Sequence, residues 1–233
     1  MCTVRIEEET FLLMMKKKMT STLQEVASST FFYELINQIL RSQLLQRNFN
    51  SVRVTMVIYA LGSIETQHRS RHQLATAILL ERVLSNWIEG IEAFDPVFSA
   101  RDELVLKMMG CKVLSTNENC RRQVEKPTMF FMPYADVHLF GNLMKTNWCS
   151  SRLNRIILLS NSLGDMLEFC RYHRTKISDQ NDVSEEVEYI EDVQKFTKEI
   201  KINSTYTSGG QIIMNSFSWH FFNMCDEEDE DEH

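Results

Sequence analysis

The residues of this chain whose types and spacing best suit chemistry lie in one short polar segment. Glu65, His68, Arg69 and Arg71 follow one another closely along the chain. A histidine near a carboxylate can transfer protons close to neutral pH, and arginine side chains bind anions. The segment is therefore a candidate acid–base or anion-binding site, and a solvated helix start is the alternative interpretation.

A glycine turn, Gly62-Ser63, precedes this segment and follows the apolar run 52–60. Glycine lets a ligand approach the backbone, and N–H groups at a helix start favour an anion. The chain contains neither G-x-G-x-x-G nor a phosphate loop ending in Gly-Lys-Ser/Thr. Ser63 lies outside a G-x-S-x-G elbow, which argues against a hydrolase nucleophile. The turn predicts either an anion-binding backbone or a plain strand-to-helix connection.

Three further groups, Asp95-Pro96, Met132-Pro133 and Asn161-Ser162, also follow apolar runs. Asp95 has the position of the acid that binds ribose in nucleotide-binding folds, and an Asx turn is the equal alternative. Because the carboxyl ends of parallel strands line one crevice, we expect these groups to meet. The candidate ligand-binding residues are Gly62, Ser63, Glu65, His68, Arg71, Asp95, Pro96, Met132, Pro133, Asn161 and Ser162.

The elements that must position these residues alternate between strand and helix. Helical patterns separate the apolar runs that predict strands, which are 52–60, 91–94, 112–114, 128–132 and 155–160. This rhythm predicts an α/β, Rossmann-like, doubly wound and mostly parallel sheet with helices on both faces. Two segments of the C-terminal third, 197–202 and 212–222, are expected to form edge strands.

Several polar residues have the spacing of helix starts. A capping box needs Ser or Thr three residues before an acid or amide. The expected caps are Ser29 or Thr30, Ser70 with Gln73, Ser99 with Asp102, and Asp136. Gly110 should close the helix that begins after Ser99.

One domain over residues 29–224 accounts for most of the 233 residues. Residues 1–28 are expected to be loosely ordered, and 225–233 to form a disordered acidic tail. The net charge is −7, and the acidic run 226–232 alone supplies this excess. A neutral body lacks the concentrated basic face that nucleic-acid binding requires, so no nucleic-acid partner is expected.

Cysteine and hydropathy patterns indicate the compartment. The six cysteines form no C-x-x-C pair, and the chain has no histidine cluster at metal-ligand spacing. Neither a disulfide framework nor a metal site is therefore expected. No apolar run approaches the ~20 residues of a membrane helix, and no secretory signal is recognisable. These features predict a cytoplasmic protein that also enters the nucleus, with no membrane partner.

An ordered set of motifs carries a family resemblance. The segment 59–65 (YALGSIE), followed by His68, Ser70-Arg71 and 73–75 (QLA), resembles the defining segment of the sensitivity-to-red-light-reduced (SRR-like) family. Further similar motifs follow in the family's order: 94–98 (FDPVF), 114–118 (LSTNE), 127–133 (PTMFFMP), Asn161-Ser162 and 217–222 (FSWHFF).

The resemblance implies a regulatory protein of cytoplasm and nucleus, linked in plants to red-light (phytochrome) signalling and circadian-clock input. Relatives outside plants are linked to haem metabolism and growth, and the family supplies no settled activity. The chain departs from the family where Tyr134-Ala135 replace His-Cys, and where Ser160 replaces a glycine. Loss of that histidine removes a candidate ligand or acid–base group, which weakens an enzymatic interpretation.

Three functions follow as hypotheses. The first is a regulator that acts through protein partners and, in one version, through a small ligand in the strand-end crevice. The second is a transferase with S-adenosylmethionine or a nucleotide as cofactor, in which Gly62 and Asp95 replace the glycine turn and the ribose acid. The third is a haem-responsive binder, for which Cys111, Cys149 and His68 are the nominal ligands.

Overall fold

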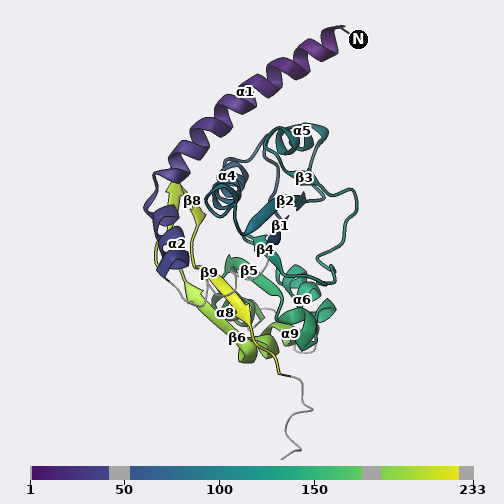
Figure 1. The fold of residues 1–233 in the computed structure, drawn as a ribbon, viewed down its shortest axis with the longest axis vertical. Helices are drawn as coiled ribbons and strands as arrows, with labels where there is room; N and C mark the ends of the chain where they lie inside the picture. The colour runs from purple at the N-terminus through teal and green to yellow at the C-terminus, as the bar shows by residue number, and fades with distance from the viewer. Residues whose placement is uncertain (1, 42–52, 175–184, 226–233) are drawn as a thin grey trace, which may run out of the picture.

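The computed structural model describes residues 2–41, 53–174 and 185–225, and its centre is a seven-stranded sheet (Figure 1). The acidic tail predicted over 225–233 falls, apart from residue 225, outside the described residues. The strands of the sheet are β1 (Val54–Tyr59), β2 (Ile88–Phe94), β3 (Lys112–Val113), β4 (Thr128–Met132), β5 (Ile156–Asn161), β6 (Thr197–Lys201) and β9 (Phe217–Phe222).

The strand order is β3-β2-β1-β4-β5-β9-β6. The first five strands are parallel, whereas β9 runs antiparallel to both β5 and β6. The chain leaves β1 in one direction and returns to its other side at β4, so the topological switch point lies between these strands. The predicted fold class, an α/β mostly parallel sheet, is confirmed.

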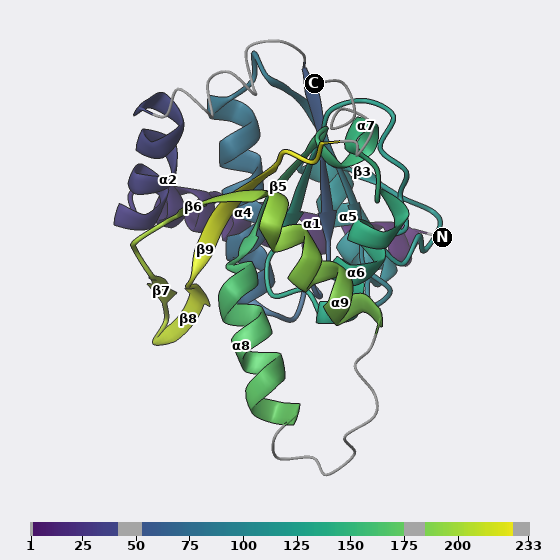
Figure 2. The same ribbon diagram turned by 90° about the horizontal axis from the view of Figure 1, so that it is seen from below.

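Two cores flank the sheet, because successive side chains of a strand point to opposite faces. Met56 and Ile58 of β1 join one core, and Val57 and Tyr59 join the other. Figures 1 and 2 show α4 and α5 on one face and α6, α8 and α9 on the other. The helices are α1 (Cys2–Ala27), α2 (Thr30–Arg41), α4 (His68–Val83), α5 (Ala100–Met108), α6 (Val137–Thr146), α7 (Ser150–Leu153), α8 (Leu163–Arg174) and α9 (Glu185–Val193), followed by the short η1 (Gln194–Phe196).

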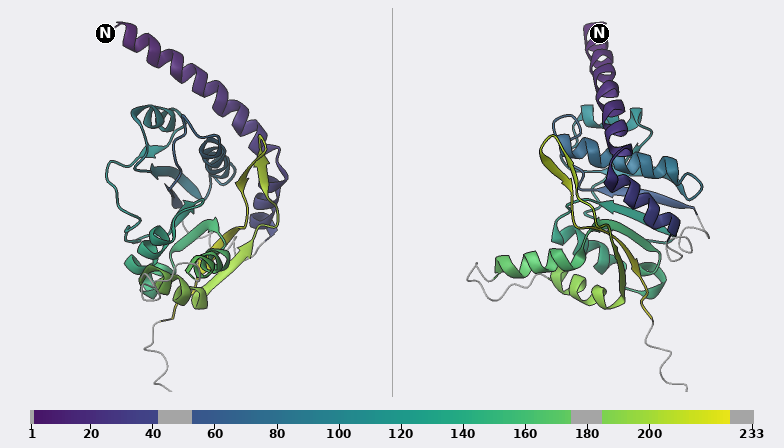
Figure 3. Two further views of the ribbon diagram at one scale, coloured as in Figure 1. Left: turned by 180° about the vertical axis from the view of Figure 1, so that it is seen from behind. Right: turned by 90° about the vertical axis from the view of Figure 1, so that its left-hand side faces the viewer.

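The prediction that residues 1–28 are loosely ordered was wrong. Residues 2–27 form α1, which packs outside α4 and continues the core beyond the helix layer (Figure 3). Phe11, Met15, Met19 and Val26 recur at helical spacing and are buried there. None of the described helices, α1 included, has the length and apolarity needed to cross a membrane.

Most of the predicted helix caps are confirmed, and one is wrong. Ser99 and Asp102 form the expected capping box, Asp136 accepts the amide of His138, and Ser29 accepts that of Phe32. The capping box at Ser70 was wrong, because α4 begins at His68 and leaves Ser70 inside the helix, where its hydroxyl donates to Gln67.

The C-terminal third also differs from expectation. The segment 197–202 was predicted as an edge strand, and β6 is the edge of the sheet. The segment 212–222 was wrongly predicted as a second edge: β9 lies between β5 and β6, and its residues are all buried. The start of that segment instead joins a separate hairpin of β7 (Tyr206–Ser208) and β8 (Gln211–Met214).

Candidate functional site

The four predicted groups meet at one edge of the sheet, because β1, β2, β4 and β5 are parallel and all end there. We call this edge the strand-end rim and define it by the residues 60–71, 95–97, 132–134 and 161–162. Two of its contacts join loops that are distant in sequence: Gly62 to Asp95, and Tyr134 to Asn161. The rim surrounds the switch point, where open α/β folds bind ligands.

Asp95 closes the glycine turn. Its Oδ2 accepts the amide of Gly62 at 2.8 Å, and its Oδ1 accepts the amide of Val97 at 3.0 Å. The second bond is the Asx turn that the sequence left as an alternative. Gly62 has φ +76°, and a Cβ there would lie 2.6 Å from Gln67 Oε1. The turn therefore needs glycine, and protein side chains fill the space beside it.

A second carboxylate, Asp102, holds the next part of the turn. Its Oδ1 accepts the amides of Ile64 at 2.7 Å and Glu65 at 2.8 Å, and the hydroxyl of Ser63 at 3.1 Å. Burial alone would raise the pKa of Asp102, but hydrogen bonds from Ser99, Glu65 and Ser63 outweigh it and lower the pKa. The amides after β1 that an anionic ligand would need therefore donate to the protein's own acids.

The other half of the rim joins β4 to β5. Asn161 Oδ1 accepts the amide of Tyr134 at 2.8 Å, and Asn161 Nδ2 donates to the carbonyl of Asn215 at 2.9 Å. The Tyr134 hydroxyl also bonds to the Asn215 side chain. The Arg69 guanidinium lies 5.0 Å from the centre of the Tyr134 ring, a cation–π contact that bridges the two halves.

Backbone strain occurs on both sides of the switch point. Ala60, directly after β1, has φ 56°, and Tyr134, after β4, has φ 57°. A residue with a Cβ pays about 1–2 kcal/mol in this left-handed region, and such strain concentrates at functional sites. Nothing in the residue types of Ala60 or Tyr134 signals this conformation, so sequence reasoning missed it.

The predicted acid–base pair does not form. Glu65 bonds to Arg101 at 2.8 Å, whereas His68 Nε2 lies 3.0 Å from the Ser208 hydroxyl on the β7–β8 hairpin. Burial, followed by the charge of His72, lowers the pKa of His68. Arg71 donates to the carbonyls of Ile64 and Glu65 and so helps to hold the turn in place.

The remaining predicted residues divide by exposure. Met132, Pro133 and Ser162 are buried, whereas Pro96 is exposed.

Cys111, a nominal haem ligand, is buried, and burial raises the pKa of its thiol to about 12. Within the described residues, no group of three histidines, cysteines or acids is arranged to hold a metal ion.

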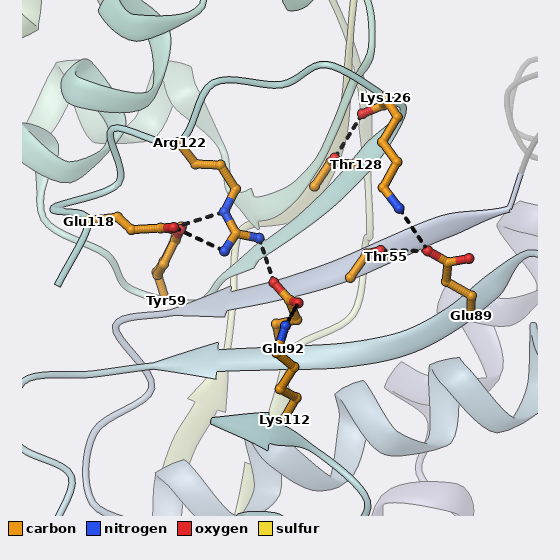
Figure 4. Close-up of polar contacts among 9 residues, drawn as sticks. All are labelled: Thr55, Tyr59, Glu89, Glu92, Lys112, Glu118, Arg122, Lys126 and Thr128. Carbon is orange, nitrogen blue, oxygen red and sulfur yellow. Dashed lines mark hydrogen bonds and ion pairs between the residues drawn. The ribbon is translucent and has the colours of Figure 1, made fainter. Parts of the chain in front are cut away.

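A charged network beside the rim was also missed (Figure 4). The Tyr59 hydroxyl donates to Glu118, Arg122 bonds to Glu118 at 3.0 and 3.1 Å, and Arg122 bonds to Glu92 at 2.7 Å. Lys112 completes the network at 2.7 Å from Glu92. The network fixes the connection 114–127 over the sheet, and Tyr59 and Glu118 both belong to the motifs quoted above.

The fold and the rim define a class: a Rossmann-like α/β protein whose polar groups gather at the topological switch point. The model of the SRR1 domain matches residues 17–221, and the chain belongs to this family. It is 34% identical over 209 residues to SENSITIVITY TO RED LIGHT REDUCED 1 of Arabidopsis thaliana, covering 88% of this chain and 73% of that protein. An SRR1-like protein of Mus musculus is 34% identical over 116 residues, covering 49% of this chain and 47% of that protein.

Among solved structures, the chain matches methyltransferases at low similarity. The 23S rRNA methyltransferase ErmE matches with a TM-score of 0.40 and 11% identity, covering 80% of this chain and 70% of its own. The plantazolicin methyltransferase BpumL matches with a TM-score of 0.39 and 11% identity, covering 95% of this chain and 100% of its own. Such low identity transfers nothing about activity to this chain.

Proposed function

We propose that this protein is a regulatory protein in a red-light response, and that it acts by binding a protein partner at the strand-end rim. We infer that the protein also contributes to circadian-clock input and resides in the cytoplasm and the nucleus. The name of the Arabidopsis relative, whose sequence matches most of this chain, supports the link to red light.

The observation that carries the proposal is that backbone amides in the turn after β1 already donate to the protein's own carboxylates. The amides of Gly62, Ile64 and Glu65 donate to Asp95 and Asp102, so a nucleotide phosphate would have to displace a carboxylate. The groups left at the surface, by contrast, suit contact with a protein. Arg69 is exposed and stacks on Tyr134, and both residue types are enriched among the residues that dominate binding at protein interfaces.

The test is complementation of Arabidopsis plants that lack SENSITIVITY TO RED LIGHT REDUCED 1. We expect this chain to restore their sensitivity to red light, and the Arg69→Glu variant to fail at equal protein level. Arg82→Glu is the matched control, because Arg82 is an exposed arginine at the far end of the same helix. Full rescue by Arg69→Glu would contradict the rim as the partner surface, and absence of rescue by the unmodified chain would contradict the red-light role.

A transferase that uses S-adenosylmethionine is the second candidate, because Asp95 directly follows β2 and lies beside a glycine turn, as a ribose-binding acid does. In that function Asp95 would release the amide of Gly62 when the cofactor binds. The loss of a bond already formed makes this the weaker candidate.

A further inference from the structure

The sheet ends at β6, and the backbone of this edge strand keeps hydrogen-bonding groups that point outward. Figures 1 and 2 show β6 on the outside of the sheet, where it pairs with β9 alone. The amide of Ile202 donates to the carbonyl of Phe217 across this pair. In an antiparallel pair, alternate residues turn both backbone groups toward the partner strand, so Thr197, Glu199 and Lys201 turn theirs away from β9.

Helix α2 covers only the C-terminal end of this edge. Gln38 Nε2 donates to the carbonyl of Lys201 at 2.6 Å, and a carboxylate oxygen of Glu34 accepts the amide of Asn203 at 3.0 Å. Among the described residues, no donor or acceptor bonds to the backbone N–H or C=O of Glu199. The middle of the edge is therefore open to a further strand.

A hollow of about 660 Å³ lies between α2 and β6. Its walls include Tyr33, Arg41 and Ile200, and the Tyr33 side chain is 68% exposed. Side chains of a strand alternate between the two faces of a sheet, so an added strand would turn one side chain toward the hollow beside Ile200. The hollow offers that side chain an aromatic and an aliphatic wall.

The charges around the hollow select an acidic partner. Arg41 and Lys198 are exposed, and neither forms an ion pair with another described residue. Lys198 lies on the same face of β6 as Ile200, because the two residues are two positions apart. Residues 42–52, which follow Arg41, contain one arginine and no acid. A second copy of β6 is a poor occupant, since antiparallel pairing centred on Glu199 would oppose two carboxylates.

We propose that the edge of β6 binds an extended, acidic peptide segment of a protein partner, which adds a strand to the sheet. The peptide backbone exchanges hydrogen bonds with the backbone of Glu199, and one apolar side chain enters the hollow between Tyr33 and Ile200. An acidic side chain of the peptide contacts Lys198 and Arg41. This edge lies at the side of the sheet, whereas the strand-end rim lies at the carboxyl ends of the strands, so the proposal is independent of the function proposed there.

The test uses a fluorescein-labelled peptide of the sequence Thr-Phe-Thr-Glu-Thr-Glu-Thr, titrated with full-length protein and followed by fluorescence anisotropy. As an antiparallel strand, this peptide places its phenylalanine beside Ile200 and its first glutamate beside Lys198. We expect saturable binding. A peptide that is N-methylated at the threonine facing Glu199 lacks the backbone donor there and should bind about 10-fold more weakly. Lys198→Glu and Arg41→Glu should each weaken binding of the unmethylated peptide about 10-fold, whereas Arg82→Glu, on α4, should leave it unchanged.

Two variants of Glu199 test the backbone of β6 directly. Glu199→Pro removes the outward N–H without removing a backbone bond to β9, whereas Glu199→Ala keeps this N–H and loses the same side chain. We expect Glu199→Ala to retain peptide binding and Glu199→Pro to weaken it about 10-fold, with circular dichroism as the check that both variants fold. Equal binding by these two variants, or equal binding of the two peptides, would overturn the proposal. Binding that survives both charge reversals, or no binding of the unmethylated peptide at millimolar concentration, would overturn it equally.

Discussion

At the residue scale, Asp102 joins two loops through one carboxylate. Its Oδ2 caps α5 by accepting the amide and hydroxyl of Ser99, each at 2.9 Å, while its Oδ1 holds the turn at 63–65. The spacing of Ser99 and Asp102 predicts the capping box. It carries no information about the turn, because the turn lies far away in sequence and only the packing of α5 on the sheet brings it near.

Loss of this carboxylate should be costly. Asp102→Ala leaves buried amide donors without acceptors, and we expect it to lower the free energy of unfolding by about 3 kcal/mol. Glu103→Ala, which removes only an exposed ion pair to Lys107, should cost less than about 1 kcal/mol. Urea denaturation of both variants measures the difference, and equal costs would show that Asp102 does not brace the turn.

His220, also a single residue, should make stability depend on pH. Burial lowers its pKa well below the ordinary value of 6.5, although the nearby Glu199 raises it in part. As the pH falls below 6.5, the unfolded chain therefore binds a proton at His220 that the folded protein does not bind. The contribution of His220 to the free energy of unfolding is complete above pH 6.5 and decreases as the pH drops below this value. The loss approaches about 1.4 kcal/mol per pH unit for this group.

The matched variant is His220→Gln, which keeps a donor for the carbonyl of Leu158 but cannot titrate. Its unfolding free energy, measured by urea denaturation, should change less between pH 7 and pH 5 than that of the unmodified protein. Identical pH profiles would contradict a neutral, buried His220.

At the element scale, α1 shows why a helix can escape prediction. The charged runs 7–9 and 16–18 place charges around the whole helix and obscure the apolar stripe of Phe11, Met15 and Met19.

The strand β9 escaped prediction for a different reason, because Ser218 and His220 alternate with aromatic residues, a pattern typical of a strand with one solvated face, whereas the structure buries all six residues. Contacts of Ser218 with Glu199 and of His220 with the carbonyl of Leu158, which the sequence does not reveal, accommodate these polar side chains inside the sheet.

Adjacent methionines of α1 offer a matched pair of variants. Met15 is fully buried and Met14 is 44% exposed. Met15→Ala should therefore lower the free energy of unfolding by about 2–5 kcal/mol, as is usual for a buried methionine, and Met14→Ala should lower it by less than about 0.5 kcal/mol. Thermal denaturation of the two variants measures the difference. Equal stabilities would mean that α1 does not pack on the domain.

At the scale of the whole molecule, the alternation of strands and helices was enough to predict the parallel sheet and the edge where its loops meet. It could not predict which side-chain atoms face a ligand, because Asp95 and Asp102 are satisfied by backbone donors from other elements. The same contacts lead to the central claim: the backbone donors of the strand-end rim already bond to protein carboxylates, so the rim is a surface for a protein partner rather than an open nucleotide pocket.

Thermal unfolding in the presence of S-adenosylmethionine, its demethylated product, nucleotides and haem tests this claim most directly. We predict no stabilisation by any of them at millimolar concentration. Stabilisation by S-adenosylmethionine of ~2.7 kcal/mol at ~100 times its dissociation constant, lost in Asp95→Ala, would contradict the claim and establish the crevice as a cofactor site.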